Sequence, residues 1–212
     1  MKNILCYGDS NTWGQVPFRD FVKQRYPFDT RWTGVLQNLA GPDYRILEEG
    51  LNGRTTGLED PAREGRNGAA YLPACLDSHV PLDLVVFMLG TNDLKKKFNS
   101  VPEIICGRMQ KLVQITKERC AEPPPCKTQI LVMAPVIPRF QYLYEDLRHP
   151  EIESFARRQV GLYETMCQDE KVHFFDASAH LEASSLDGAH LEARVHQEFG
   201  KAVFGRIRQI LV

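Results

Sequence analysis

The sequence of 212 residues has no hydrophobic run of membrane-spanning length and no excess of charge of either sign. A transmembrane helix needs about 20 consecutive apolar residues, whereas the apolar runs here have the length of single strands. With 26 basic and 27 acidic residues, the net charge is -1, so the charge balance attracts neither a nucleic-acid backbone nor an anionic membrane. We therefore expect neither nucleic acid nor membrane among its partners.

The first residues lack the apolar segment of a secretory signal, because residues 4–7 alone are apolar before charged and turn-forming residues follow. The cysteines show neither CxxC spacing nor the spacing of a zinc site; they are Cys6, Cys75, Cys106, Cys120, Cys126 and Cys167. Structural disulfides are rare in the reducing cytosol. We therefore expect a cytoplasmic protein without structural disulfides.

Several motifs of other enzyme classes are absent. Neither GxGxxG nor GxxxxGK[ST] occurs, which argues against a dinucleotide or nucleoside triphosphate site. The GxSxG nucleophile elbow of the α/β-hydrolases is not matched by Gly8-x-Ser10-x-Thr12, which also lies at the start of the chain rather than in its middle. The three lysines at 95–97 form the one sharp basic run, and we interpret them as a solvated helix start.

The sequence does contain an alternation of short apolar runs and amphipathic segments. Strand-like runs rich in Val, Ile, Leu and Phe occupy 3–7, 44–47, 84–89, 130–134 and 172–175, and apolar residues recur with helical spacing in 31–39, 101–116, 152–166 and 193–211. Near-continuous apolar strands are typical of a parallel sheet covered on both faces. The pattern predicts a three-layer α/β/α fold in one domain over residues 1–212.

Residues that can carry out chemistry follow several of these strands. Ser10 follows the first strand, Gly53 the second and Asn92 the third, and Asp187 and His190 come after the fifth. Ligands of an open parallel sheet bind beyond the carboxyl ends of its strands. We therefore expect one sheet edge to collect a nucleophile, oxyanion donors and a base with its orienting carboxylate.

Each of these residue types suits one step of acyl transfer. Ser10 needs a base to become a nucleophile, and the imidazole of His190 can take its proton and later protonate the leaving group. Asp187 lies three residues earlier, so its carboxylate can accept the Nδ1 proton and leave Nε2 directed at the serine. The backbone N–H groups of Ser10 and Gly53 and the amide of Asn92 can bind the oxyanion.

Simpler interpretations exist for the same residues. Ser10 can be a turn serine, Gly53 a turn glycine and Asn92 a helix cap. Asp187 and His190 could ligate a metal, but no third ligand stands at a plausible spacing in the sequence. We therefore expect no metal.

Four blocks in the chain resemble those of the SGNH (GDSL-type) hydrolases, and they occur in the same order: Gly8-Asp9-Ser10, Gly53, Gly90-Thr91-Asn92-Asp93 and Asp187-x-x-His190. Further stretches are similar to the bacterial arylesterase and acyltransferase branch of that superfamily: Arg31-Trp32-Thr33-Gly34, Glu48-Glu49-Gly50-Leu51, Arg54-Thr55-Thr56 and Asn67-Gly68.

This resemblance implies a flavodoxin-like sheet of five parallel strands and ester hydrolysis without a cofactor, often in an oligomer. It implies that Ser10 is the nucleophile, that Gly53 and Asn92 belong to the oxyanion hole, and that Asp187 and His190 complete the catalytic set. We accordingly expect a homo-oligomer that acts on a small-molecule ester.

One departure and two loops bear on the substrate. Asn11 stands where the GDSL wording has leucine, directly after Ser10, and we expect Asn11 and Trp13 to contact substrate. The irregular segments 15–30 and 135–150 carry several aromatic residues. We expect aromatic residues of these segments to bound a narrow acyl pocket.

The sequence therefore predicts a serine esterase that cleaves short-chain acyl or aryl esters through an acyl-serine intermediate. An alcohol could resolve that intermediate in place of water, which would give acyl transfer. The same site could instead serve a carbohydrate O-acetylesterase or a thioesterase. A ligand-binding module without catalysis is the non-enzymatic alternative.

Overall fold

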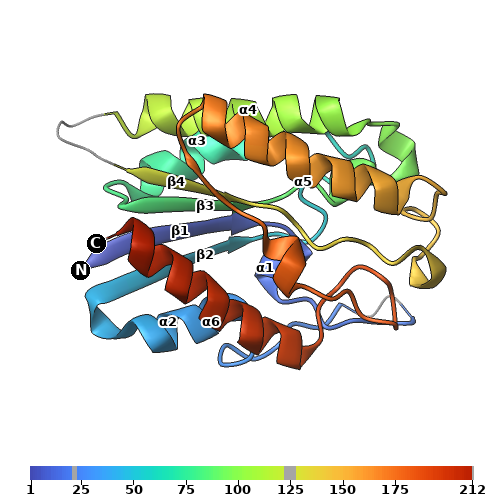
Figure 1. Cartoon of the computed structure of the whole chain (residues 1–212), viewed down its shortest axis with the longest axis horizontal. Helices are drawn as coiled ribbons and strands as arrows, with labels where there is room; N and C mark the ends of the chain where they lie inside the picture. Colours follow the sequence, from blue (N-terminus) through green and yellow to red (C-terminus); the bar gives the residue numbers. More distant parts are fainter. Residues whose placement is uncertain (21–22, 122–127, 212) are drawn as a thin grey trace.

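A five-stranded parallel sheet runs through the centre of the molecule (Figure 1). The structure is a computed structural model that describes residues 1–20, 23–121 and 128–211. The strands are β1 (Lys2–Gly8), β2 (Tyr44–Gly50), β3 (Leu84–Met88), β4 (Gln129–Met133) and β5 (His173–Phe175), and their order in the sheet is β2-β1-β3-β4-β5. Each neighbouring pair is parallel. The predicted five-stranded parallel sheet is confirmed.

Helices cover both faces of this sheet. Helices α2 (Trp32–Ala40) and α6 (Ala193–Ile210) lie on one face, and α3 (Gly68–His79), α4 (Pro102–Arg119) and α5 (Ile152–Asp169) lie on the other (Figure 1). Successive strand residues point to opposite faces. Ile4 and Cys6 of β1 therefore belong to one buried cluster, and Leu5 and Tyr7 to the other. The predicted three-layer architecture is confirmed.

Short helical turns fill the connections at the ends of the strands. Helix α1 (Ser10–Trp13) directly follows β1. The 3₁₀ turns are η1 (Gly41–Asp43), η2 (Asn92–Leu94), η3 (Lys96–Phe98), η4 (Phe140–Tyr142) and η5 (Ala177–His180). Two of these short elements, α1 and η2, carry the serine and the asparagine of the predicted site.

The sequence pattern did not predict α3. Gly68 opens this helix and Pro73 lies inside it, and both residue types disfavour a helix interior. The helix forms because the side chain of Asn67 caps it, accepting a hydrogen bond from the Ala70 N–H at 3.2 Å, and because Leu72 and Leu76 are fully buried against the sheet. Tertiary packing outweighs weak local preference here.

The interpretation of the lysines at 95–97 as a solvated helix start is wrong for Lys95, whereas Lys96 and Lys97 are exposed and begin the 3₁₀ turn η3. Helix α4 begins at Pro102, and Lys95 keeps just 5% of its surface exposed. The described cysteines 6, 75, 106, 120 and 167 are buried free thiols, while Cys126 lies outside the described residues. Among the helices that the structure describes, none is long and apolar enough to span a membrane.

Candidate active site

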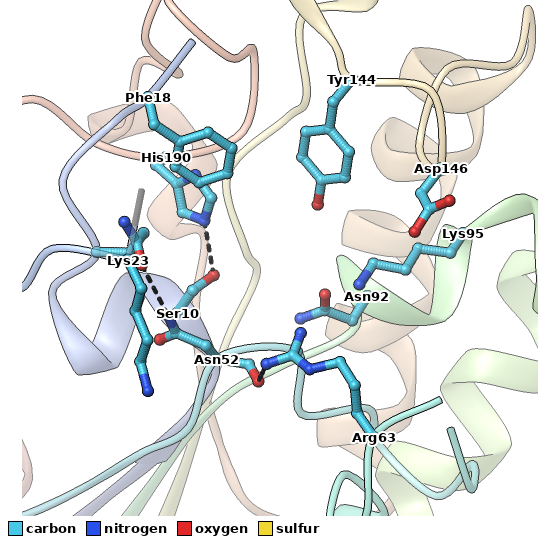
Figure 2. A pocket seen from close by; sticks show the side chains of 12 residues that line it. Ser10, Phe18, Lys23, Asn52, Arg63, Asn92, Lys95, Tyr144, Asp146 and His190 are labelled. Atoms are coloured by element: carbon cyan, nitrogen blue, oxygen red, sulfur yellow. Dashed lines mark hydrogen bonds between the residues drawn. The ribbon is translucent and has the colours of Figure 1, made fainter. Parts of the chain in front are cut away.

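Three predicted catalytic side chains form one hydrogen-bonded chain. The Ser10 hydroxyl lies 3.0 Å from Nε2 of His190 (Figure 2), and Nδ1 of His190 lies 2.8 Å from Oδ2 of Asp187. Ser10 begins α1 at the carboxyl end of β1, whereas the other two residues come from the turn that precedes α6. Both distances fit a nucleophile, a base and an orienting carboxylate.

Asp187 is held as an ionised acceptor on the far side of His190. Its Oδ1 accepts the backbone N–H groups of Ala189 at 3.1 Å and His190 at 2.9 Å, and its Oδ2 also accepts the N–H of Phe18 at 3.0 Å. Burial alone would raise the pKa of Asp187, but these hydrogen bonds and the one from the imidazole hold that pKa below its ordinary value. The carboxylate therefore favours a protonated Nδ1 and leaves Nε2 free to act on Ser10.

Helix α1 is fixed by the residues on either side of Ser10. Asp9 caps the helix, because its Oδ1 accepts the Asn11 N–H at 3.0 Å. The amide Nδ2 of Asn11 donates to the Ala189 carbonyl at 3.1 Å. This bond links the turn that carries the nucleophile to the turn that carries His190.

Candidate oxyanion donors meet beside the Ser10 hydroxyl. Within the described ranges, the backbone N–H groups of Ser10 and Gly53 donate to no protein acceptor. Gly53 has a φ of +83°, which a residue with a side chain rarely adopts. The amide Nδ2 of Asn92 donates to the Arg54 carbonyl at 3.1 Å, and its contact to Asp9 Oδ2 is long at 3.5 Å. One amide hydrogen is thus fixed, and the other can turn to a developing oxyanion.

A buried carboxylate ties the two oxyanion segments together. Asp93, next to Asn92 on η2, accepts the Thr56 N–H at 3.0 Å and the Thr56 hydroxyl at 2.5 Å. Burial raises the pKa of Asp93 to about 6, although the hydrogen bonds from Thr56 and the charge of Arg108 oppose that rise. Burial likewise raises the pKa of Asp9 to about 6, against its hydrogen bond from Asn11.

The catalytic serine and histidine open onto a cavity of about 230 Å³. Polar side chains dominate its wall, which comprises Ser10, Gln15, Phe18, Lys23, Asn52, Gly53, Arg63, Asn92, Lys95, Tyr144, Asp146 and His190 (Figure 2). Phe18 comes from the segment 15–30 and Tyr144 from the segment 135–150. The structure thus places one aromatic residue of each predicted loop in the wall of the cavity.

The two residues predicted to contact substrate lie outside this wall. Asn11 is 4% exposed and uses its amide to hold Ala189. Trp13 instead packs beneath two cations, with Lys23 Nζ 5.1 Å and Arg25 Cζ 5.3 Å from its ring centre. Asn11 therefore holds the turn that carries His190, and Trp13 contacts Lys23 and Arg25; neither residue lines the cavity.

Sequence reasoning missed Asn52, Arg63 and Lys95 as lining residues. Two of them could have been found from their distance in sequence to a predicted site residue. Asn52 adjoins Gly53, and Lys95 follows Asn92 by three residues, which is one turn of a 3₁₀ helix. Arg63 had no such signal. It reaches the cavity because its loop folds back and Nη2 donates to the Asn52 carbonyl at 2.8 Å.

A separate group of side chains has metal-ligating atoms. Glu49, Cys75 and His79 bring one such atom each to within 4.8 Å of one another, but none of the three lines the cavity at Ser10. The Glu49 carboxylate already lies 3.4 Å from His79 Nε2 and 3.9 Å from the Arg54 guanidinium. Burial, followed by the charge of Glu49, raises the pKa of Cys75 to about 12, which disfavours the thiolate. This group therefore stands apart from the cavity at Ser10.

The GDSL-like lipase/acylhydrolase family model matches residues 6–197. The chain belongs to this family. Together with the esterase structures that it resembles, this membership makes the protein a carboxylic-ester hydrolase of the SGNH type. No curated protein matches the chain.

Solved structures of esterases resemble this GDSL-like hydrolase along its whole length. An aryl esterase from M. smegmatis is 36% identical, with 100% of each chain covered and a TM-score of 0.92. A carbohydrate acetylesterase from Sinorhizobium meliloti is 35% identical over 99% of this chain and 100% of that one, with a TM-score of 0.92. A putative arylesterase from Agrobacterium tumefaciens is 34% identical, with 100% of each chain covered and a TM-score of 0.88.

Proposed function

We propose that this hydrolase cleaves small esters with short acyl chains, aryl esters among them, through an acyl-serine intermediate at Ser10. The observation that carries the proposal is the chain from Ser10 Oγ to His190 Nε2 at 3.0 Å and from His190 Nδ1 to Asp187 at 2.8 Å. The resemblance to two arylesterase structures supports the aryl-ester part.

The first half of the reaction acylates the serine. Ser10 Oγ attacks the ester carbonyl while Nε2 of His190 takes the hydroxyl proton. The carbonyl oxygen becomes an oxyanion, which the N–H groups of Ser10 and Gly53 and the amide of Asn92 stabilise. The C–O bond to the alcohol then breaks, and His190 gives its proton to the departing oxygen.

The second half releases the acyl group. A water molecule loses a proton to His190 and attacks the acyl carbonyl, which forms a second tetrahedral intermediate. The bond from the acyl carbon to Ser10 Oγ then breaks, His190 returns its proton to Oγ, and the carboxylic acid leaves. An alcohol in the same position would take the acyl group instead. We include acyl transfer in the proposal because both acceptors use the same base and the same oxyanion donors.

The cavity favours a short acyl chain. Its volume of about 230 Å³ lies below the range of about 300–1,000 Å³ typical of drug-sized ligand sites, and Phe18 and Tyr144 stand in its wall. We expect acetyl esters to react faster than decanoyl esters, measured as kcat/KM on nitrophenyl esters. Equal rates on the two would contradict a narrow acyl site.

Removal of acetyl groups from carbohydrates is the second candidate. The polar lining of the cavity suits hydroxyl-rich alcohols, and one similar structure is a carbohydrate acetylesterase. Release of acetate from fully acetylated glucose, compared with release from phenyl acetate, separates this candidate from an aryl preference.

The deciding experiment is hydrolysis of 4-nitrophenyl acetate by the parent chain and by Ser10→Ala and His190→Ala, with and without a chelator. We expect both variants to lose nearly all turnover and the chelator to change nothing. Ser154→Ala is the matched control, since its hydroxyl bonds a helix carbonyl on the exposed surface of α5. An inactive parent, or full activity in Ser10→Ala, would favour the ligand-binding alternative.

The cytoplasmic location and homo-oligomeric state stay predictions.

A further inference from the structure

The cavity around Ser10 carries an excess of positive charge. Among the lining residues that the structure describes, Lys23, Arg63 and Lys95 stand against the single carboxylate of Asp146. The whole chain has a net charge of -1, so this concentration of cations is local and does not follow from the composition.

Lys95 is the most unusual of these cations. It is 5% exposed, and within the described ranges no hydrogen bond or ion pair holds its ammonium group. Its neighbours differ: Lys96 pairs with Glu145, and Lys97 lies 2.8 Å from Asp60. Lys95 lines the cavity, and its Nζ is not among the fully buried atoms. An ammonium group that loses most of its contact with water still costs free energy unless a partner compensates it.

The groups around Lys95 disfavour its positive charge more than they favour it. Burial first, and then the charges of Lys97 and Arg63, lower the pKa of Lys95, while Asp146 and Asp60 act in the opposite direction. Asp146 is exposed, and within the described ranges no ion pair joins it to Lys95. A bound anion would compensate the largely buried ammonium group directly.

Arg63 brings a second cation to the oxyanion region. Its guanidinium lies so close to Gly53 that a Cβ built on the glycine would be 2.6 Å from Nη1. The loop that carries it is anchored, because Asp60 accepts Lys97 and its carbonyl accepts the Arg63 N–H at 3.0 Å. The guanidinium is therefore held at the edge of the cavity.

These two cations approach the serine hydroxyl from a different direction than His190. Figure 2 shows His190 above the Ser10 hydroxyl, with Lys95 to the right of it and Arg63 below and to the right. His190 protonates the leaving alcohol, so the alcohol occupies the histidine side. The cations then face the acyl part of the substrate.

We propose that the acyl group of the preferred ester ends in a carboxylate, which Lys95 and Arg63 bind. The substrate class is then the half-esters of short dicarboxylic acids, and hydrolysis yields a free alcohol and a dicarboxylic acid. The inference rests on the ester hydrolysis proposed above. It adds an anion site that an acetyl or butyryl chain would leave empty.

The test compares two substrates that differ in this charge. The mono-4-nitrophenyl ester of glutaric acid carries a free carboxylate, and its methyl ester is neutral and otherwise matched; the adipic pair extends the chain by one carbon. Spontaneous hydrolysis is measured without enzyme and subtracted. We expect the parent to prefer the charged substrate by about tenfold or more in kcat/KM, because a hydrogen bond to a charged group contributes about that much.

Removing a cation and removing the carboxylate should change the preference for the charged substrate in opposite directions. Lys95→Met and Arg63→Met should each lower the ratio of charged to neutral kcat/KM, and Asp146→Asn should raise it by removing the opposing carboxylate. Lys96→Met is the matched control, since that side chain pairs with Glu145 and does not line the cavity, and it should keep the parent ratio. Thermal melting confirms that each variant is folded.

The outcomes separate this inference from the proposed function. Efficient cleavage of the neutral ester with no preference for the charged one, or an unchanged ratio in Lys95→Met, overturns the anion site and leaves the esterase intact. A preference for charge on the alcohol alone, measured with 4-acetoxybenzoate and its methyl ester, also overturns it. Hydrolysis of neither kind of substrate overturns the proposed function, and this inference with it.

Discussion

The buried carboxylate of Asp93 provides a sharp test of how the oxyanion segments are held. Its side chain is fully buried and accepts the N–H and hydroxyl of Thr56. The Arg108 guanidinium is 3.9 Å away. We consider Asp93→Asn, which keeps the shape of the side chain but removes its ability to ionise.

The magnitude follows from proton linkage. Burial raises the pKa of Asp93 from 3.8 to about 6 in the folded state, whereas an unfolded chain has the ordinary value of about 3.9. As the pH rises between these values, the unfolded state loses the proton first, so the free energy of unfolding falls. Stability that is fully present below about pH 4 is lost by about pH 6, and the loss amounts to about 3 kcal/mol.

The assay is urea denaturation of the parent and of Asp93→Asn at several pH values between about 3.5 and 7.5. The free energy of unfolding of the variant also differs from that of the parent because the hydrogen bonds with Thr56 change. This difference should not depend on pH. The free energy of unfolding of the variant, relative to the parent, should therefore rise by about 3 kcal/mol across this interval. Asp9 remains in both proteins, so its own titration cancels. Parallel pH profiles would refute a raised pKa at Asp93.

Three further substitutions test the site and its support. Asn92→Ala should lower kcat on 4-nitrophenyl acetate by about 10²–10³ with a smaller change in KM, because it removes an oxyanion donor; a change confined to KM would contradict that role. Asp187→Asn should lower kcat by about 10⁴, since the amide no longer favours the Nδ1-protonated imidazole, and near-parent turnover would count against the assignment. Gly90→Ala should destabilise the fold by about 3 kcal/mol or more in urea denaturation, because φ is +125° and the new Cβ would lie 1.9 Å from Gln159 Nε2. Gly161→Ala, with no heavy atom within 4 Å of its added Cβ, is the control and should leave stability unchanged or raise it by up to about 1 kcal/mol.

The sheet and the catalytic set could be predicted because local sequence determines them. A strand buried on both faces must be apolar over several residues, and β1, β3 and β4 each show such a run close to its observed bounds. Parallel strands bring their carboxyl ends to one edge. Ser10 and Asn92, which directly follow β1 and β3, therefore had to meet there.

The wall of the cavity could not be predicted in the same way, because distant segments build it. The lysines at 95–97 resemble a solvated charge run, yet Lys96 N–H bonds the Asp146 carbonyl at 2.9 Å, which brings the loop around Asp146 against this turn. Lys95 is buried beneath a contact between residues about 50 apart in sequence. The predicted contact of Asn11 with substrate depended on a similar assumption. Asn11 follows Ser10 in the sequence, but this position does not fix the direction in which its side chain points.

Arg54 shows how the fold, rather than the catalytic residues themselves, sets the geometry of the site. Its guanidinium donates to the carbonyl of Gly8 at 3.1 Å and to the carbonyl of Glu49, so it links the ends of β1 and β2. Its own carbonyl accepts Asn92 from the segment after β3. The side chain is stacked at 4.0 Å over the ring of Tyr7 and is almost fully buried. One residue without a chemical step thus holds together three strand ends, and the spacing between the nucleophile and the oxyanion donors depends on that link.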